Sequence, residues 1–306
     1  MKKTIVIALG GNALLARGEA LSAENQYRNI AQIADAVASL SQEYQVVIVH
    51  GNGPQVGLLA LQNQAYSDSP AWPLDVLVAE TQGMLGYMIA QVLGSRAGIP
   101  PVVTLLTRVE VDAADPAFRQ PGKYIGPVWA AEEQSALEAR YGWQMKKDGD
   151  YVRRVVPSPR PQKILERRAI SQLLADGNVV ICAGGGGTPV VEENGSYQGM
   201  EAVVDKDLAA SVLAQSLQAE ALLILTEADA VYLDWGTPKA RALRTATVDD
   251  LRPLAVPDGA MGPKAEAAIQ FVEMTGHPAY IGALRDAPAI LRGEKGTLIA
   301  PAAVCV

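Results

Sequence analysis

The sequence predicts an α/β fold in which a mostly parallel sheet carries helices on both faces. Short apolar runs typical of buried strands alternate with longer stretches at helical spacing, as in repeated strand–helix units. Apolar residues make up 49% of the 306-residue chain, yet it holds only two Phe, so Ala, Val, Leu and Ile must build the core. That choice suits buried parallel strands. Three of the strands also end in glycine-rich turns.

The expected elements follow one another in order along the chain. Buried strands are expected over the apolar runs at 3–9, 45–49, 102–106, 178–182, 221–226, 278–282 and 296–299. Helices are expected after the N-cap candidate Ser22 at 30–40, and then at 54–66, 74–97, 163–175, 205–218, 247–254 and 262–276. Residues 112–155 lose this pattern at Pro116, Pro121 and Pro127, and we interpret them as a flap inserted on the main sheet.

Charge and cysteine content exclude several classes of protein. The net charge of −7 argues against a nucleic-acid partner, which favours a basic face. Three short basic pairs are interpreted as solvated surface: Lys146-Lys147, Arg153-Arg154 and Arg167-Arg168. The two cysteines, Cys182 and Cys305, lack metal-ligand spacing and fit the reducing cytoplasm. The uncharged stretch 81–95 is too short to span a bilayer, so no membrane segment is expected.

The glycine-rich turns indicate a bound polyanion. They are Gly10-Gly11-Asn12, His50-Gly51-Asn52-Gly53 and Gly184-Gly185-Gly186-Gly187. Because glycine has no side chain, backbone N–H groups can approach an anion closely, and a following helix adds the positive end of its dipole. Ligands of open parallel sheets bind beyond the carboxyl ends of the strands, where these turns are expected to meet. One such turn could be only a tight turn, but three at one edge favour phosphate binding.

Other familiar chemistries lack their motifs. No Gly-x-x-x-x-Gly-Lys-Ser/Thr loop occurs, and no Gly-x-Gly-x-x-Gly follows the first strand. No Ser-His-Asp or Cys-His order indicates a hydrolase, and no cluster has zinc-ligand spacing, so no metal-ligating residues are predicted.

Two further groups of polar residues allow alternative interpretations. Glu227, Asp229 and Tyr232 follow the strand at 221–226, and they could border a nucleotide or cap the next turn. His50 directly follows a buried strand, which favours a hydrogen-bonded structural role over general-base catalysis.

Three lysines are candidates to neutralise a phosphoryl group in transfer. Lys206 and Lys264 are each expected at a helix start, where a cation is unfavourable unless an anion binds there too, and Lys123 lies in the flap. Phosphoryl transfer needs charge neutralisation and in-line positioning more than covalent chemistry. Asp207 could hold Lys206 and Lys264 by pairing with both. Asp205 could assist through Mg²⁺ or the nucleotide, or the two aspartates could simply cap the helix.

Eight motifs recur in order from one end of the chain to the other. They are GGNAL at 10–14, HGNGPQVG at 50–57, ETQGM at 80–84, RRVVPSP at 153–159, the four glycines at 184–187, DKDL at 205–208, ADAVY at 228–232 and MGPK at 261–264. Together they resemble the motifs of the carbamate kinases, a family within the amino-acid kinase superfamily. HGNGPQ and RRVVPSP are specific to this family rather than to amino-acid kinases in general.

The resemblance implies an open three-layer αβα sandwich with a mainly parallel central sheet and a small protruding flap subdomain at about 112–155. It implies one domain over 1–306, with an N-lobe at about 1–215 that binds carbamoyl phosphate and a C-lobe at about 216–306 that binds nucleotide. The implied reaction is reversible phosphoryl transfer between carbamoyl phosphate and ADP with Mg²⁺, giving ATP and carbamate. The implied enzyme is a cytoplasmic homodimer, often serving arginine, agmatine or allantoin degradation.

The resemblance also implies roles for individual residues. Lys206 and Lys264 would bridge the transferring phosphoryl group, Lys123 would contact the carbamate end, and Asp207 would organise the lysines. Carbamoyl phosphate would be cradled by Gly10, Gly11, Asn12, Gly51, Asn52 and Gly53. The nucleotide site would be lined by Gly185, Asp205, Glu227, Ala228, Asp229, Tyr232 and Met261.

The chain departs from the family's usual pattern around the flap lysine. Pro121-Gly122-Lys123-Tyr124 stands where Pro-Thr-Lys-Pro is common. All three lysines are kept, so the departure bears on flap closure and substrate fit.

Two alternatives to a carbamate kinase stay open. One is another amino-acid kinase, acting on acetylglutamate, aspartate or UMP, which needs a larger pocket. The other is a non-catalytic nucleotide-binding homologue, which the loss of a lysine would have indicated.

Overall fold

The computed structural model describes residues 2–11, 14–15, 18–66, 70–256 and 260–301. Its main sheet has eight strands in the order β15-β17-β16-β12-β1-β2-β9-β3. In chain order they are β1 (Lys3–Leu9), β2 (Tyr44–His50), β3 (Val102–Thr104), β9 (Val179–Ile181), β12 (Ala221–Thr226), β15 (Thr245–Thr247), β16 (Ala279–Ala283) and β17 (Thr297–Ala300). Neighbouring strands run parallel except β16 and β17. This confirms the predicted fold class.

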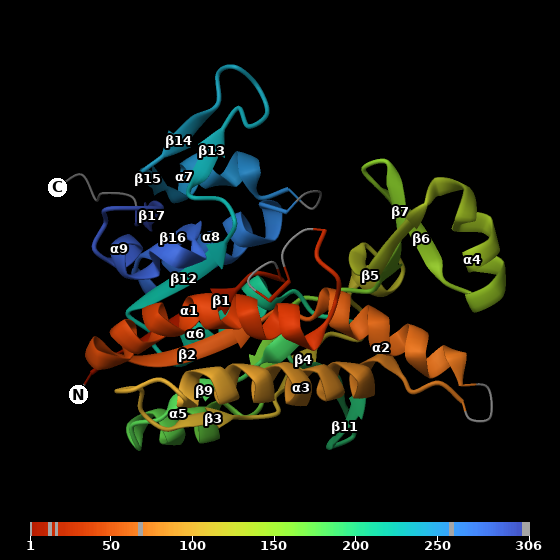
Figure 1. The fold of residues 1–306 in the computed structure, drawn as a ribbon, viewed down its shortest axis with the longest axis horizontal. Helices are drawn as coiled ribbons and strands as arrows, with labels where there is room; N and C mark the ends of the chain where they lie inside the picture. Colours follow the sequence, from red (N-terminus) through yellow and green to blue (C-terminus); the bar gives the residue numbers. More distant parts are fainter. Residues whose placement is uncertain (1, 12–13, 16–17, 67–69, 257–259, 302–306) are drawn as a thin grey trace.

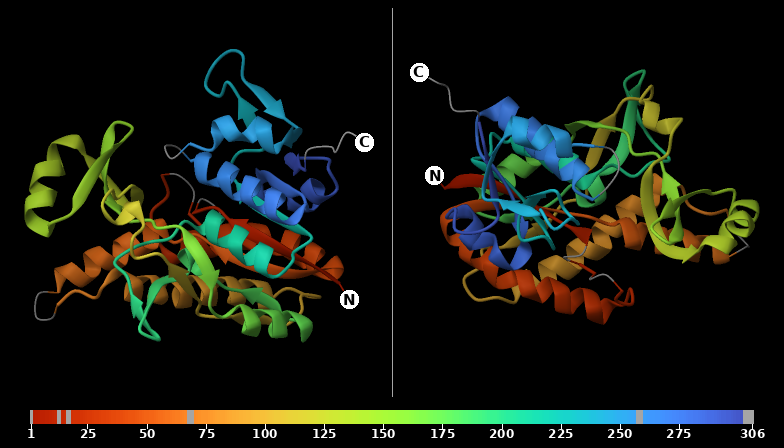
Figure 2. Two further views of the ribbon diagram at one scale, coloured as in Figure 1. Left: turned by 180° about the vertical axis from the view of Figure 1, so that it is seen from behind. Right: turned by 90° about the horizontal axis from the view of Figure 1, so that it is seen from above.

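Two helical layers cover the sheet because its strands are apolar on both faces. Along β1, Ile5, Ile7 and Leu9 point to one face and Val6 and Ala8 to the other. The first face is covered by α1 (Ala23–Glu43), α3 (Leu74–Gly94) and α9 (Ala287–Leu291) (Figure 1). The second face is covered by α5 (Arg167–Ala175), α6 (Lys206–Ser216), α7 (Val248–Leu251) and α8 (Gly262–Thr275), seen from behind in Figure 2.

A small subdomain protrudes from this sandwich (Figure 1). Its antiparallel sheet has the order β5-β7-β6 and carries one helix: the elements are β5 (Lys123–Ala130), α4 (Gln134–Tyr141), β6 (Gln144–Asp148) and β7 (Tyr151–Val156). We call residues 123–156 the flap. Four side chains form a hydrophobic cluster of its own: Leu137, Trp143, Met145 and Val152.

The flap is packed on the helix α2 (Gly53–Ala65) at a point where side chains are absent. A Cβ atom on Gly57 would lie 2.0 Å from the Cα atom of Gly126, which itself has a φ of +72°. The two backbones therefore touch directly, next to the irregularity that separates Ile125 from Val128 in β5.

A second sheet and a hairpin were not predicted. The sheet has the order β11-β10-β4-β8 and contains β4 (Arg108–Val111), β8 (Pro161–Ile164), β10 (Thr188–Glu193) and β11 (Ser196–Gly199). The hairpin pairs β13 (Val231–Leu233) with β14 (Arg241–Leu243). The helix expected at 163–175 begins at Arg167, because residues 163–164 complete β8.

Helix α3 is longer than the uncharged stretch 81–95 that the sequence analysis weighed. By length and composition it is the one helix among the described residues that could cross a membrane, and half of its most apolar window is buried in the fold. Leu85, Ile89 and Leu93 pack with α1 and the main sheet. These contacts are those of a core helix.

Candidate active site

The carboxyl ends of β1, β2 and β9 meet at one edge of the main sheet. Leu9 pairs with His50, and Ile48 pairs with Ile181, so the turns that follow these strands come together. A Cβ atom on Gly51 would lie 3.2 Å from the Cδ atom of Lys206, so this side chain would have to shift slightly to admit it. Gly185 has a φ of +64°, and a Cβ atom there would overlap the side chain of Asn52.

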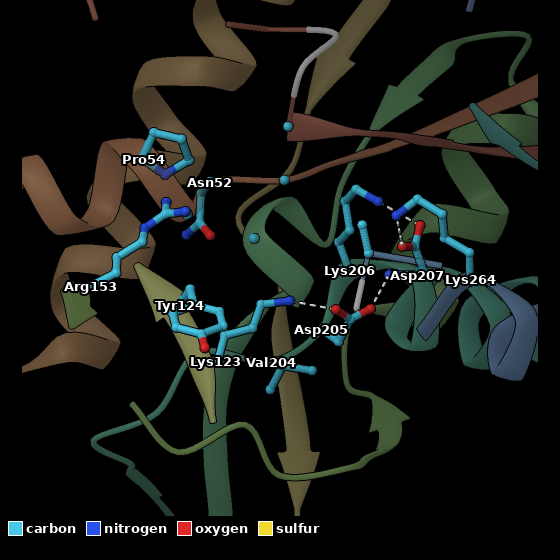
Figure 3. A pocket seen from close by; sticks show the side chains of 15 residues that line it. Asn52, Pro54, Lys123, Tyr124, Arg153, Val204, Asp205, Lys206, Asp207 and Lys264 are labelled. Atoms are coloured by element: carbon cyan, nitrogen blue, oxygen red, sulfur yellow. Dashed lines mark hydrogen bonds and ion pairs between the residues drawn. The ribbon is translucent and has the colours of Figure 1, made fainter. Parts of the chain in front are cut away.

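These turns line a cavity of about 340 Å³ (Figure 3). The sequence analysis had singled out ten of its lining residues: Gly11, Gly51, Asn52, Gly53, Lys123, Gly185, Asp205, Lys206, Asp207 and Lys264. It had not assigned the other five: Pro54, Tyr124, Arg153, Val204 and Ala260. The three lysines therefore converge on one space from the flap, from α6 and from α8.

Asp207 pairs with two lysines at once. One of its oxygens accepts a hydrogen bond from Lys206, and Oδ2 accepts one from Lys264 at 3.0 Å. Burial lowers the pKa of Lys206, and the charge of Asp207 only partly offsets this. Burial would also lower the pKa of Lys264, but the charges of Asp207 and Asp205 raise it. Burial alone would raise the pKa of Asp207, yet the two lysines hold it below its usual value. One buried carboxylate thus holds both lysines in place.

Asp205 connects the flap to α6. Its Oδ1 atom accepts the backbone N–H groups of Asp207, at 2.8 Å, and Leu208, so it is the N-cap of the helix. Its Oδ2 atom accepts a hydrogen bond from the flap's Lys123. Burial would raise the pKa of Asp205, but Lys123, Lys206 and Lys264 together lower it far below its usual value. The carboxylate therefore caps the helix and holds Lys123 over the cavity.

The prediction that Arg153-Arg154 is solvated surface is wrong. Both side chains are partly buried, and the alternation of β7 directs them to opposite faces. Arg153 lines the cavity, and burial lowers its pKa. Arg154 packs over the ring of Trp143 with 4.8 Å between its guanidinium carbon and the ring centre. Two adjacent arginines of a strand point to opposite faces, so recognising RRVVPSP as a strand would have shown that the two arginines differ in their surroundings.

Several predicted residues do not line the cavity. Gly10 lies behind it, where its N–H group bonds to the carbonyl of Leu225 at 2.9 Å. Five residues assigned to the nucleotide are absent from its lining: Glu227, Ala228, Asp229, Tyr232 and Met261. The hydroxyl of Tyr232 donates to Asp229 at 2.8 Å, and Met261 packs against the core. Asn12 lies outside the described residues. The nucleotide roles of these residues stay predictions.

His50 is built into the wall behind the turns. Its side chain is buried, and its Nδ1 atom lies 3.0 Å from the carbonyl of Gly51. Burial lowers the pKa of His50 to about 4, so the ring is neutral at pH 7. This arrangement agrees with the structural role that its position after a buried strand favoured.

The cavity contains carboxylates that could bind a hard cation, but they do not form a complete set of metal ligands. Among the described residues, no group of three or more His, Cys, Asp or Glu side chains could hold a metal ion. Asp205 and Asp207 are ionised oxygen donors, which suit Mg²⁺, but each is already engaged by a lysine. Mg²⁺ fits this site only if nucleotide phosphates supply most of its ligands.

The arrangement suits phosphoryl transfer. Three glycine turns and three lysines surround one space, and its two carboxylates are held by cations rather than free to attack. Such a site stabilises charge on a group that moves between two substrates.

Comparison with known proteins agrees with this chemistry. The model of the amino acid kinase family matches residues 3–283. A carbamate kinase of Escherichia coli K12 is 60% identical over 297 residues, which cover 97% of this chain and 99% of that enzyme. Carbamate kinase from Giardia lamblia bound to citric acid is 37% identical, with a TM-score of 0.91 over 98% of this chain and 99% of that one. The same enzyme bound to AMP-PNP has a TM-score of 0.87 over the same shares of the two chains.

The chain therefore belongs to the amino acid kinase family and, within it, to the carbamate kinases. It is a phosphotransferase.

Proposed function

We propose that the protein catalyses reversible, Mg²⁺-dependent phosphoryl transfer between carbamoyl phosphate and ADP, giving ATP and carbamate. The observation that carries the proposal is the convergence of Lys123, Lys206 and Lys264 on one cavity beside three glycine turns. The similarity of the chain to the carbamate kinases named above is the second support. Carbamate released by the reaction breaks down to ammonia and CO₂.

The three lysines and the glycine turns on the cavity each have a task in this reaction. Lys206 and Lys264, held by Asp207, neutralise the oxygens of the phosphoryl group as it moves. The glycine turns at Gly11 and Gly51 let the same group approach the backbone closely without adding bulk. Lys123 leaves Asp205 for the substrate and brings the flap down, which excludes water that would hydrolyse carbamoyl phosphate.

Mg²⁺ would arrive with the nucleotide. The carboxylates of Asp205 and Asp207 are the oxygen donors that could share it with the phosphates of ADP or ATP. When bound, Mg²⁺ neutralises phosphate charge and orients the terminal phosphate for in-line attack.

A very small substrate is favoured over an amino-acid side chain. Glycine residues and the compact side chains of Asn52 and Pro54 form the turn side of the cavity, which leaves few groups to recognise a larger acyl chain. This separates the proposal from the alternative of an acetylglutamate, aspartate or UMP kinase.

We propose the following setting for the enzyme. It works as a homodimer in the reducing cytoplasm, where its buried free thiol at Cys182 stays unreacted. Carbamoyl phosphate from arginine, agmatine or allantoin degradation would drive the reaction toward ATP. Sedimentation equilibrium tests the dimer, because a monomer mass at micromolar concentration contradicts it.

The direct test is coupled ATP formation from ADP, Mg²⁺ and carbamoyl phosphate, beside acetyl phosphate and acetylglutamyl phosphate. Rapid turnover with carbamoyl phosphate alone is expected. Lys206→Ala should lower kcat by about 10²- to 10³-fold, the usual effect of removing one group that stabilises a transition state. Circular dichroism should show the variant folded. Turnover of acetylglutamyl phosphate without carbamoyl phosphate would refute the proposed substrate.

A further inference from the structure

Arg153 is a fourth cation on the cavity, and the proposed function leaves it without a task. It extends from β7 of the flap on the side of the cavity where Asn52 and Pro54 lie (Figure 3). Lys206 and Lys264 lie on the opposite side, with Lys123 between (Figure 3). A ligand whose phosphoryl group contacts Lys206 and Lys264 would therefore extend its other end toward Arg153.

The guanidinium of Arg153 is fixed in place but weakly neutralised. Its Nε atom donates to the carbonyl of Gly126 at 2.8 Å, which sets the plane of the group. Its Nη1 atom lies 3.6 Å from Asp148 Oδ2, longer than a hydrogen bond, and the arginine side chain is 21% exposed. By contrast, each lysine on the cavity donates a hydrogen bond to a carboxylate: Lys123 to Asp205, and Lys206 and Lys264 to Asp207.

A fixed guanidinium is suited to a planar partner. Arginine presents parallel N–H groups in one plane, which match the two oxygens of a carboxylate, whereas lysine acts as a point charge. The carbamoyl end of carbamoyl phosphate is planar, and it becomes a carboxylate-like anion when carbamate departs. The phosphoryl group is tetrahedral and already faces the lysines.

We propose that Arg153 binds the carbamoyl end of the substrate and hydrogen-bonds the departing carbamate, so that it determines specificity for a small planar acyl group. The inference rests on the proposed function. In the ATP-forming direction, the bond from phosphorus to the carbamate oxygen breaks, and its electron pair stays on carbamate. A β-phosphate oxygen of ADP forms the new bond to phosphorus, and no proton moves. The charge that reaches carbamate is spread over two oxygens, which face the guanidinium.

The test separates the two ends of the substrate by binding alone. Phosphonoacetamide, in which CH₂ replaces the bridging oxygen of carbamoyl phosphate, carries both ends and cannot react; inorganic phosphate carries one. Calorimetry measures the affinity of each for the wild type, Arg153→Gln, Arg153→Lys and Arg154→Gln. Arg154 is the matched control, because it is the adjacent arginine of the same strand and packs on Trp143 instead of lining the cavity. Urea unfolding establishes that each variant is folded.

The expected result is a loss confined to the acyl end. Arg153→Gln should bind phosphonoacetamide about 10- to 100-fold more weakly, the range for a hydrogen bond to a charged group, and phosphate within about 2-fold of the wild type. Arg153→Lys should recover only part of the loss, because it keeps the charge without the planar donors. Arg154→Gln should bind both probes as the wild type does. In turnover, Arg153→Gln should raise KM for carbamoyl phosphate and leave KM for ADP unchanged.

Three outcomes would overturn the inference. Equal losses for both probes would mean that Arg153 acts on the phosphate or on the flap as a whole. Unchanged affinity for phosphonoacetamide in Arg153→Gln would leave the residue without a binding role. A wild type that binds phosphonoacetamide no better than phosphate would mean that no acyl site exists. Failure of the proposed function has a different signature, namely wild-type turnover of another acyl phosphate in place of carbamoyl phosphate.

Discussion

Asp207→Asn isolates the role of the carboxylate that pairs with both Lys206 and Lys264. The Asp207 side chain is 2% exposed, and those of Lys206 and Lys264 are 9% and 14% exposed. An asparagine has the same shape but no charge, so two buried cations would lose their counterion. Breaking a buried ion pair by removing one partner destabilises a protein by about 3 to 5 kcal/mol. With a urea slope of about 3 kcal/mol per molar, the unfolding midpoint should fall by roughly 1 to 2 M.

The pH dependence of unfolding identifies the lysines as the cause of the stability lost in Asp207→Asn. In the variant, the pKa of Lys206 falls further below its unfolded value, since burial remains and the charge of Asp207 is gone. Between the two values the unfolded chain then binds more protons than the folded one, so stability rises with pH. The difference in unfolding free energy between Asp207→Asn and the wild type should therefore shrink from pH 7 toward pH 9.5.

The matched control is Asp249→Asn, which removes a carboxylate from the exposed ion pair with Arg252. No measurable shift of its midpoint is expected, because exposed pairs contribute little. The expected fall of the urea midpoint is roughly 1 to 2 M, and a fall of less than about 0.3 M in Asp207→Asn would refute the reasoning. The same stability loss at pH 7 and pH 9.5 would refute it too.

Three further predictions concern the parts around the lysines. Gly57→Ala should force the flap away from α2, because its Cβ atom would lie 2.0 Å from the backbone of Gly126. The kcat of this variant should fall by about 10-fold or more. The control Gly83→Ala, which has open space around its Cβ atom, should keep wild-type activity. Asp205→Asn keeps the helix cap but loses the charge that holds the flap lysine, so trypsin should cleave the flap faster than in the wild type; equal cleavage would contradict this contact. Stability should fall by about 1.5 kcal/mol from pH 6.5 to pH 5, because the pKa of His50 is lowered to about 4 and only the unfolded chain takes up the proton. His50→Asn should flatten that slope in urea titrations, and an unchanged slope would assign it to other groups.

The predicted strands of the main sheet were confirmed because their signal is local. Buried parallel strands such as β1 and β2 are continuous apolar runs, and these cannot be satisfied at a surface. The strands β4, β8 and β10 were missed because they mix exposed with buried residues over four to six positions. In β8, the pattern around Ile164 also matches a helix, and only pairing with β4 decides between the two.

The site was predictable as a set of residue types and unpredictable as a set of contacts. Lysines at two helix starts signalled an anion, since the helix dipole disfavours them there. The ion pair between Lys123 and Asp205 joins residues 82 positions apart, and the local sequence around either residue does not predict this contact. Arg153 was misassigned because charge and sequence neighbours do not reveal which face of a flap strand is turned inward.

The charges on the cavity suit a polyanion. Four cations line it, namely Lys123, Arg153, Lys206 and Lys264, against the carboxylates of Asp205 and Asp207, so two positive charges are left over. The whole chain carries −7, and positive charge is therefore concentrated beside the glycine turns. Because the two carboxylates already hold the lysines in the cavity, an arriving phosphate finds them ordered and loses little conformational entropy on binding. The same carboxylates limit the excess charge that the folded, ligand-free protein has to bury.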